Sequence, residues 1–386
     1  MVRIGIIGVG GMGSAHAHYL FDGKVTGATL AALCDIDKGR RVVLANEFPG
    51  LPLFATAEEL FDSNLCDAVI IATPHYDHPR IGVQAFARGL HVLSEKPMAV
   101  QVSEAGRFIR AAEESGRAFC VMFNQRTDPL FQKARELVQG GVLGELKRVN
   151  WIITNWYRTQ AYYDSGSWRA TWSGEGGGVL MNQAPHNLDL LQWICGLPKR
   201  VLALCSVAKY HHIEVEDEAL IFGEYQNGAT LTFHTSTGEY PGTNRLEITG
   251  DGGKLVLEEG KLKLWRLRER ERDYCFTATE GFGHIPLDYE EFTFPVPNGH
   301  GTILQNFVDH IESGVPLISD GREARNEVLL ANSAYLSAWQ GNWVDIPFDE
   351  AAFDELLAAK ATDSAKTGEA TPSLHKDYQE RWQVRW

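Results

Sequence analysis

Two side chains, His186 and Lys96, combine the chemistry needed to accept a proton and to hold a developing negative charge. His186 lies in the segment GGGVLMNQAPHNLDLLQW, where Pro185 fits the first turn of a helix. A spacing of four and then three residues places Asn182, His186 and Asp189 on one face of that helix or of its entry turn. The opposite face is apolar and is expected to be core: Leu190, Leu191 and Ile194. Histidine is the usual acceptor of a proton from an alcohol undergoing oxidation, although a buried, hydrogen-bonded histidine is the simpler interpretation of His186 taken alone.

Lys96 follows the short apolar run 90–93, within the turn Ser94-Glu95-Lys96-Pro97. In a doubly wound sheet, ligands bind at the carboxyl ends of the strands, so this turn would lie where a nicotinamide ring is held. Pro97 keeps Lys96 out of the helical conformation and fixes the turn. A lone lysine after a strand is usually solvated surface, and the flanking residues favour a functional role only modestly.

A glycine-rich turn fits the dinucleotide-binding pattern GxGxxG: Gly8-Val9-Gly10-Gly11-Met12-Gly13. It stands between an expected strand, 3–8, and an expected helix, 14–21. In that context Gly8 makes the tight turn, Gly10 lets the backbone approach a pyrophosphate, and Gly13 permits close helix–strand packing. The helix N-terminus adds free N–H groups for the phosphates. The alternative is an ordinary strand-to-helix turn.

Asp35 closes the second expected strand, 22 residues after Gly13. A carboxylate there accepts hydrogen bonds from both ribose hydroxyls of the adenosine and repels a 2′-phosphate, which favours NAD over NADP. Arg40 and Arg41 follow and could reach a phosphate. A second role for Asp35, as the N-cap of the next helix, is compatible with the first.

The first 125 residues are expected to form the domain that carries these groups. Short runs that are apolar throughout predict strands, and stretches of helical period separate most of them. Such strands are covered on both faces, so the sheet is parallel and doubly wound. The expected strands and helices are 3–8, 14–21, 28–34, 37–48, 67–72, 78–88, 90–93, 103–115 and 118–123.

Residues 126–345 are expected to form a second, α+β domain with a large, mainly antiparallel sheet. The stretch 200–295 has the pattern of an antiparallel meander, with a strong hairpin signal at Asn227-Gly228. The other expected elements are a helix, an alternating strand and two later helices: 128–139, 146–157, 302–313 and 322–339.

The C-terminal tail, 346–386, contains a short helical pattern at 350–360 and ends in DYQERWQVRW. Two exposed tryptophans on a mobile tail would be unfavourable. We therefore expect the tail to pack on the body or on a neighbouring subunit.

The glycine motif, the Glu-Lys-Pro turn and the Gly-Gly-Gly…His-x-x-Asp helix, in this order and spacing, resemble the Gfo/Idh/MocA oxidoreductases. That family includes glucose–fructose oxidoreductase, inositol dehydrogenases and rhizopine-catabolism proteins, and the resemblance covers about residues 1–340. It implies a Rossmann domain followed by a domain with an open antiparallel sheet, and it implies Lys96 and His186 at the chemical step. The family often has aspartate where this chain has Asn182. A neutral amide cannot offset the charge of Lys96, so His186 is left as the base, while Asn182 can still bond Lys96 or a substrate hydroxyl.

The resemblance also implies further contacts. Those expected with the cofactor, beyond Gly8, Gly10, Gly11, Met12, Gly13 and Asp35, are Thr73, Pro74, His75, His78, Glu95, Lys96, Asn124, Trp168 and Arg169. Those expected with the substrate are Lys96, Arg126, Tyr157, Arg158, Asn182, His186 and Tyr335. Aromatic faces and arginines suit a sugar, but the aromatic residues could equally pack under the sheet. His211-His212 is expected to be loop surface and not a metal site, because no third ligand is spaced to join the pair.

Composition narrows the class of protein. Asp plus Glu is 50 and Lys plus Arg is 36, which gives a net charge of −14 and argues against general nucleic-acid binding. No apolar run of about 18 residues predicts a membrane helix, and the start, MVRIGIIGVGG, lacks signal-peptide features. Six separated cysteines without a CxxC pair fit a reduced, cytoplasmic protein without a metal site.

The combined expectation is an NAD-dependent enzyme that reversibly oxidises a secondary hydroxyl of a sugar, polyol or glycoside. His186 would remove the proton and Lys96 would orient the hydroxyl. The alternatives are a dehydrogenase of another alcohol, an enzyme that uses bound NAD in a redox cycle, and a regulator that binds dinucleotide without catalysis. The resemblance, together with an uncovered sheet face, implies a homodimer or homotetramer.

Overall fold

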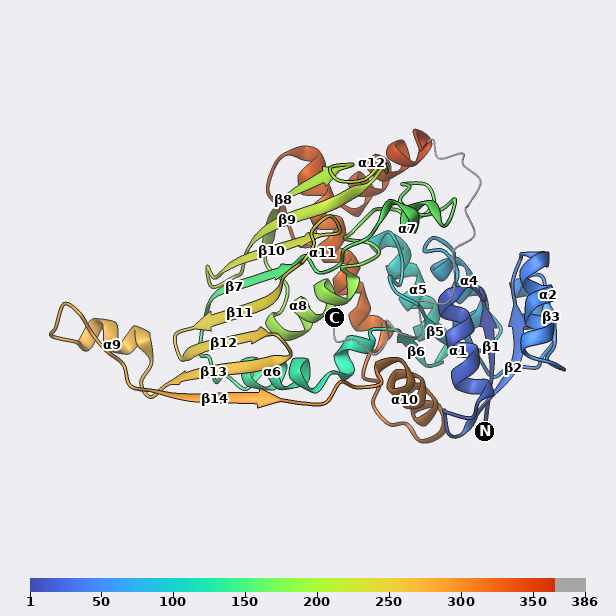
Figure 1. Ribbon diagram of the computed structural model, residues 1–386, viewed down its shortest axis with the longest axis horizontal. Helices are drawn as coiled ribbons and strands as arrows, with labels where there is room; N and C mark the ends of the chain where they lie inside the picture. Colours follow the sequence, from blue (N-terminus) through green and yellow to red (C-terminus); the bar gives the residue numbers. More distant parts are fainter. Residues whose placement is uncertain (365–386) are drawn as a thin grey trace.

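The computed structural model describes residues 1–364 and arranges them around two sheets (Figure 1). The first sheet has the strand order β3-β2-β1-β4-β5-β6, and every pair in it is parallel. Its strands are β1 (Val2–Ile7), β2 (Ala28–Cys34), β3 (Leu53–Phe54), β4 (Ala68–Ile71), β5 (His91–Ser94) and β6 (Phe119–Val121). The predicted doubly wound parallel sheet is confirmed.

Helices cover both faces of this sheet because alternate strand residues point to opposite sides and both sets are apolar. On one face Ile4 and Ile6 pack with helices α1 (Gly11–Phe21) and α2 (Lys38–Glu47). On the other face Val69 and Ile71 pack with α3 (Ala57–Asp62), α4 (Asp77–Ala87) and α5 (Val102–Ser115). These helices cover the two faces of the sheet and leave the carboxyl ends of its strands free to form a site.

A late helix, α10 (Gly299–Ser313), completes the face that carries α1. Ile303 and Phe307 of α10 are fully buried against that layer, together with Ile4. This differs from the predicted division of the chain, in which 302–313 belonged with the second domain. The apolar stripe of α10 would suit either layer, so periodicity alone could not assign it to one of them.

The second sheet has nine strands in the order β14-β13-β12-β11-β7-β10-β9-β8-β15. They are β7 (Leu146–Ile153), β8 (Arg200–Val207), β9 (Glu216–Glu224), β10 (Thr230–Ser236), β11 (Asn244–Gly250), β12 (Gly253–Glu258), β13 (Lys261–Leu267), β14 (Leu287–Thr293) and β15 (Val344–Asp345). Among the described pairs only β7 with β10 is parallel, so the sheet is mainly antiparallel, as predicted.

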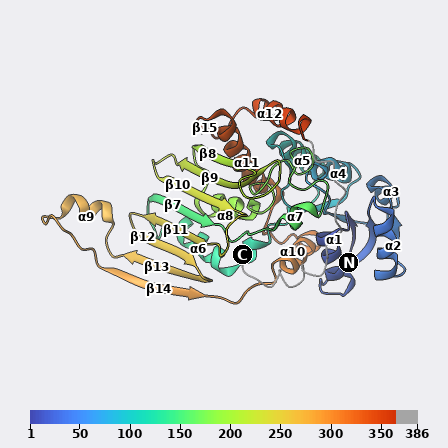
Figure 2. The same ribbon diagram turned by 45° about the horizontal axis from the view of Figure 1, so that its top comes forward.

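The predicted simple meander over 200–295 is wrong in one respect. Strand β7, which comes earlier in the chain, lies between β10 and β11 and pairs with both. The chain therefore crosses the end of β7 between Ser236 and Asn244 where a hairpin would otherwise join neighbouring strands. A short helix, α9 (Glu271–Thr277), also interrupts the run between β13 and β14 and projects from the far end of the sheet (Figure 2).

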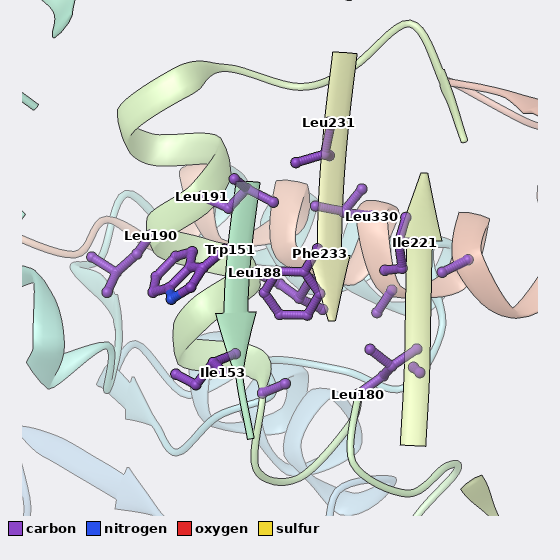
Figure 3. Packing of buried hydrophobic residues seen from close by; sticks show 14 of the residues in the cluster. Trp151, Ile153, Leu180, Leu188, Leu190, Leu191, Ile221, Leu231, Phe233 and Leu330 are labelled. Atoms are coloured by element: carbon purple, nitrogen blue, oxygen red, sulfur yellow. The ribbon is translucent and has the colours of Figure 1, made fainter. Parts of the chain in front are cut away.

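One face of the second sheet is packed against α6 (Pro129–Gln139), α8 (Pro185–Cys195) and α11 (Gly321–Gln340). Figure 3 shows Trp151 and Phe233 of the sheet meeting Leu188 of α8 and Leu330 of α11. Leu190, Leu191 and Ile194 are buried, as the helical pattern predicted. Packing of these residues therefore fixes the position of α8 on the second sheet.

The last described helix, α12 (Glu350–Thr362), packs on the body. Phe353 and Leu357 are buried, and Asp354 accepts hydrogen bonds from Gln101 and Ser103. The remaining part of the predicted tail, 365–386, lies outside the described residues.

Candidate active site

The glycine turn after β1 has the shape required to hold a pyrophosphate. Gly8 has φ of +83°, a conformation that side chains rarely adopt. A Cβ on Gly13 would lie 2.0 Å from the carbonyl oxygen of Gly8, so only glycine allows α1 to begin this close to the strand. A Cβ on Gly10 would meet nothing within 4 Å, which leaves room for a phosphate beside the helix N-terminus. The residues present therefore fit a dinucleotide.

Asp35 follows β2 directly, and its carboxylate is held at the edge of this turn. Oδ2 accepts a hydrogen bond from the backbone N–H of Val9 at 2.9 Å, and Oδ1 accepts one from the N–H of Asp37 at 2.9 Å. The possible second role for Asp35 is wrong, because Asp37 is the residue that caps α2. Arg40 donates to the carbonyl oxygen of Val9 at 2.7 Å and Arg41 to that of Asp35 at 2.6 Å, so both guanidinium groups are held at the turn.

The turn that carries Lys96 is tied to the dinucleotide helix. Glu95 is buried, and its Oε1 lies 2.7 Å from Nε2 of His16 on α1. Burial opposes ionisation of Glu95, but the hydrogen bond and the charge of His16 prevail and lower its pKa to about 2. Glu95 is therefore an anion that anchors the turn and sits beside Lys96.

Lys96 reaches from this turn to the segment before α8. Its Nζ donates a hydrogen bond to the backbone carbonyl of Asn182 at 2.6 Å. Burial lowers the pKa of Lys96, and the charge of Glu95 is the largest opposing influence. Lys96 and Asn182 are thus brought together, as the sequence analysis allowed, but through the backbone of Asn182 and not through its amide.

His186 is the second residue of α8, immediately after Pro185. Burial, and after it the charge of Lys96, lower the pKa of His186 well below its usual value, so the ring is neutral. Its buried Nδ1 has no hydrogen-bond partner within residues 1–364. The simpler interpretation of a hydrogen-bonded core histidine is therefore not what this part of the chain shows. A neutral imidazole beside an ammonium group is able to accept a proton.

Two site residues were missed by the sequence analysis. Glu175 is 1% exposed, and its Oε1 accepts a hydrogen bond from Nδ2 of Asn182. Tyr162 accepts hydrogen bonds at its hydroxyl from Asn182 at 3.1 Å and from Arg169 at 2.9 Å. The signal that could have drawn notice to Glu175 is a lone carboxylate next to three consecutive glycines.

A third group comes from α10. His300 lies close enough to Lys96 and Glu95 for their charges to affect it, and burial lowers its pKa to about 4. Nδ1 of His300 is 3.5 Å from Nδ2 of Asn124, whose buried Oδ1 has no partner within residues 1–364. The sequence analysis missed His300, which lies just before the helix that it predicted at 302–313.

Three predicted contacts need correction. Arg126 is fully buried, and its guanidinium forms a two-point ion pair with Asp189 at 2.6–2.7 Å and a further bond to Glu323. With its donors spent in this way, Arg126 is not available to a substrate. Asp189 lies three residues after His186 in α8, and its carboxylate is held by Arg126.

Tyr335 is also fully buried and does not border the site. Its hydroxyl donates to Oε1 of Glu216 at 2.7 Å and accepts the N–H of Gly178 at 3.3 Å. It supports the glycine segment from behind, where a Cβ on Gly178 would lie 1.9 Å from the backbone oxygen of Glu216. His78 is likewise structural, because its ring nitrogens lie 2.7 and 2.8 Å from the backbone oxygens of Pro97 and Thr73.

The remaining predicted residues lie in the loops that follow β4 and β7. The buried His75 lies 2.9 Å from the backbone oxygen of Glu175 and contacts the ring of Trp168, so Thr73-Pro74-His75 adjoins the later loop. Arg169 stacks over Trp168 at 4.6 Å. Two others lie further out: Tyr157 is 44% exposed and contacts Tyr240, and Arg158 bonds the carbonyls of Trp156 and Tyr157.

The predicted surface position of His211 is wrong. Its ring lies between Asp217, at 3.0 Å, and the backbone oxygen of Arg158, at 2.9 Å. Within residues 1–364 no group of three or more His, Cys, Asp or Glu side chains could hold a metal ion. The same residues contain no helix long and apolar enough to cross a bilayer.

Known proteins are similar to this chain over most of its length. The chain is 23% identical over 364 residues to inositol 2-dehydrogenase of Corynebacterium glutamicum, with 92% of this chain and 99% of that protein covered. It is 25% identical to the scyllo-inositol 2-dehydrogenase (NAD(+)) of Bacillus subtilis, over 83% of this chain and 89% of that protein. The WlbA dehydrogenase of Bordetella pertussis, solved with NADH and UDP-GlcNAcA, superposes with a TM-score of 0.76 at 25% identity and covers 90% of this chain and 99% of its own.

Two family models match consecutive parts of the chain. Residues 2–123 match the oxidoreductase family with an NAD-binding Rossmann fold, and residues 131–256 match the GFO/IDH/MocA C-terminal domain. The two matches together span well over half of the sequence and include the glycine turn, Lys96 and His186. The chain belongs to the Gfo/Idh/MocA family of NAD-binding oxidoreductases.

Proposed function

We propose that this protein reversibly oxidises a secondary hydroxyl group of a sugar, polyol or glycoside, with NAD as the hydride acceptor. The observation that carries the proposal is the hydrogen bond from Lys96, at the carboxyl end of β5, to the carbonyl of Asn182, four residues before His186. The charge of Lys96 also helps to lower the pKa of His186. The names of the relatives support the substrate class, since two of them act on inositols and a third was solved with a nucleotide sugar.

The chain's own residues divide the work in this proposal. Lys96, fixed on the carbonyl of Asn182, places a positive charge where the substrate oxygen gains negative charge. His186 accepts the hydroxyl proton. Gly10 and Asp35 would hold the pyrophosphate and the adenosine ribose of NAD, which supplies the nicotinamide that takes up the hydride. The packing of α8 holds His186 in place, and the hydrogen bond of Glu95 to His16 holds the turn that carries Lys96.

The aromatic and basic loop beside the site supports a carbohydrate substrate. Arg169 lies over the rings of Tyr162 and Trp168 at 4.7 and 4.6 Å, so flat apolar faces and a guanidinium group are presented together. A sugar offers both C–H faces and hydroxyl groups to such a surface.

The test is NADH absorbance on mixing the enzyme with NAD and a panel of aldoses, inositols, glycosides and anhydrosugars. A substrate found in this way should be turned over about 10²–10⁴-fold more slowly by His186→Ala and by Lys96→Met, with NAD affinity retained. The exposed His212→Ala and Lys147→Met serve as matched controls and should behave as wild type. Near-wild-type turnover by either site variant would refute the assignment, and silence of the wild type across the panel would favour a bound-NAD redox cycle or a sensor.

We also propose that copies of this chain associate, as a homodimer or homotetramer in the cytoplasm, through the face of the second sheet that residues 1–364 leave uncovered. Leu204 and Phe222, on the adjacent strands β8 and β9, are 63% and 40% exposed. Apolar side chains clustered on an open sheet face are a common basis for association. All six cysteines are unpaired thiols, which fits a reducing compartment.

A further inference from the structure

Glu175 is a buried carboxylate at the site that the mechanism above does not use. It stands at the end of the loop before the glycine segment, and it is 1% exposed. Oε2 accepts the N–H of Ala170 at 2.6 Å, and Oε1 accepts a hydrogen bond from Nδ2 of Asn182. A buried charge is retained only where partners compensate for its lost hydration, so these contacts fix the side chain.

Both hydrogens of the Asn182 amide are committed. One is donated to Glu175, and the other to the hydroxyl oxygen of Tyr162 at 3.1 Å. Arg169 donates to the same hydroxyl oxygen at 2.9 Å. A carboxylate can only accept, so the amide must turn its nitrogen toward Glu175 and its oxygen the other way.

The oxygen of that amide is therefore left facing away from Glu175. Asn182 is partly exposed, and its Oδ1 accepts no hydrogen bond from another side chain or backbone group of residues 1–364. The backbone of the same residue holds Lys96. The oriented acceptor thus belongs to the residue whose backbone carbonyl binds the ammonium group that the proposed reaction uses.

We propose that Glu175 is a positioning residue that fixes the Asn182 amide so that Oδ1 accepts a hydrogen bond from a substrate hydroxyl. The inference rests on the proposed function, because an alcohol bound at Lys96 and His186 supplies that hydroxyl. In this proposal the carboxylate at position 175 and the amide at position 182 depend on each other, because one accepts the hydrogen bond that the other donates.

Charge explains why the pair is matched. Burial raises the pKa of Glu175, and this effect is opposed by Arg169, the N–H of Ala170, Asn182 and Lys96. A second carboxylate at position 182 would lie in hydrogen-bond contact with Glu175, and two such groups can hold only one negative charge comfortably. A carboxylate at 182 would suit the site only if position 175 became neutral.

The experiment compares Glu175→Gln, Asn182→Asp and the double variant in steady-state kinetics with a substrate found in the panel. Each single change should lower kcat/KM by about 10–100-fold. Asn182→Asp should also move the acid limb of the pH profile to higher pH, because the new carboxyl group and Glu175 would share a proton. The double variant should return to within about fivefold of wild type, since an amide at position 175 can donate to a carboxylate at position 182. Asp164→Asn, the same kind of change at an exposed position of α7 (Gln160–Asp164), is the matched control and should leave kcat/KM unchanged.

A double variant as impaired as the product of the two single changes would overturn the inference. So would an unshifted pH profile in Asn182→Asp, and this measurement decides alone if the Glu175→Gln protein does not fold. NAD affinity and thermal midpoint identify folded variants. An active wild type with either contrary result refutes the positioning role alone, whereas an inactive wild type refutes the proposed function and this inference with it.

Discussion

The carboxylate of Glu95 and the imidazole of His16 are joined by a 2.7 Å hydrogen bond that links the strand end bearing Lys96 to the helix of the glycine turn. Because α1 begins at the glycine turn, this hydrogen bond connects the turn expected to bind the cofactor with the turn that carries Lys96. The same carboxylate is the largest influence that raises the pKa of the partly desolvated Lys96.

Removal of that charge should change the pH dependence of catalysis. Glu95→Gln removes the largest influence that opposes the effect of burial on Lys96, so the pKa of Lys96 falls further. If the ammonium form is required, the alkaline limb of the kcat/KM profile shifts to lower pH, and turnover at neutral pH drops about tenfold for each pKa unit by which the limb passes below the assay pH. A profile that keeps its alkaline limb would contradict this electrostatic role.

Asp35 should govern the choice of cofactor. Asp35→Ser removes the charge that would repel a 2′-phosphate and the acceptors that would bind the ribose. NAD binding is expected to weaken by about 1.5–3 kcal/mol, and the preference for NAD over NADP should shrink, helped by the nearby Arg40. Titration with both cofactors, followed by quenching of tryptophan fluorescence, gives the two dissociation constants. Unchanged discrimination would show that another residue excludes NADP.

Arg126 should matter for stability and not for substrate affinity. Arg126→Met leaves Asp189 charged and buried without its partner, which should cost about 3–5 kcal/mol in urea unfolding. Arg126→Met/Asp189→Leu removes both charges and should recover part of that loss. The folded fraction of either variant should keep the wild-type KM, and a large rise in KM would restore Arg126 to the substrate site.

The open sheet face should control association. Leu204→Lys places a charge in the centre of the exposed apolar strand pair, at a position where it cannot be accommodated in a dry interface. Light scattering after size exclusion should show a higher assembly for wild type and a smaller one for the variant. The control is Lys38→Ala, on the outer helix α2 and away from the second sheet, because a change such as Ser206→Lys would lie on the same strand as Leu204. A wild-type protein that is monomeric at micromolar concentration would refute the proposal.

The sequence predicted the positions of helices and strands better than it predicted which elements pack together. Runs that are apolar throughout placed the parallel strands, and Pro185 and the spacing around it placed α8 with His186 at its start. Periodicity shows which side of an element is apolar, but not which layer covers that side, so the helix predicted at 302–313 was assigned to the second domain.

Hydrogen-bond partners of buried polar side chains could not be predicted from the sequence either. The family resemblance implied a substrate contact for Arg126, and nothing in the local sequence reveals Asp189, 63 residues later, as its partner. Glu175 was overlooked for the same reason, since its importance comes from its hydrogen bond to Asn182 within the folded loop.

The return of α10 to the first sheet has a consequence for how the chain must fold. Ile303 and Phe307 close an apolar layer whose strands were all made by residue 121. The first 125 residues, taken as a fragment, would leave that face open to water and prone to aggregation. During synthesis this face of the first sheet is therefore completed only after α10 has been made, almost 200 residues after the last strand of that sheet.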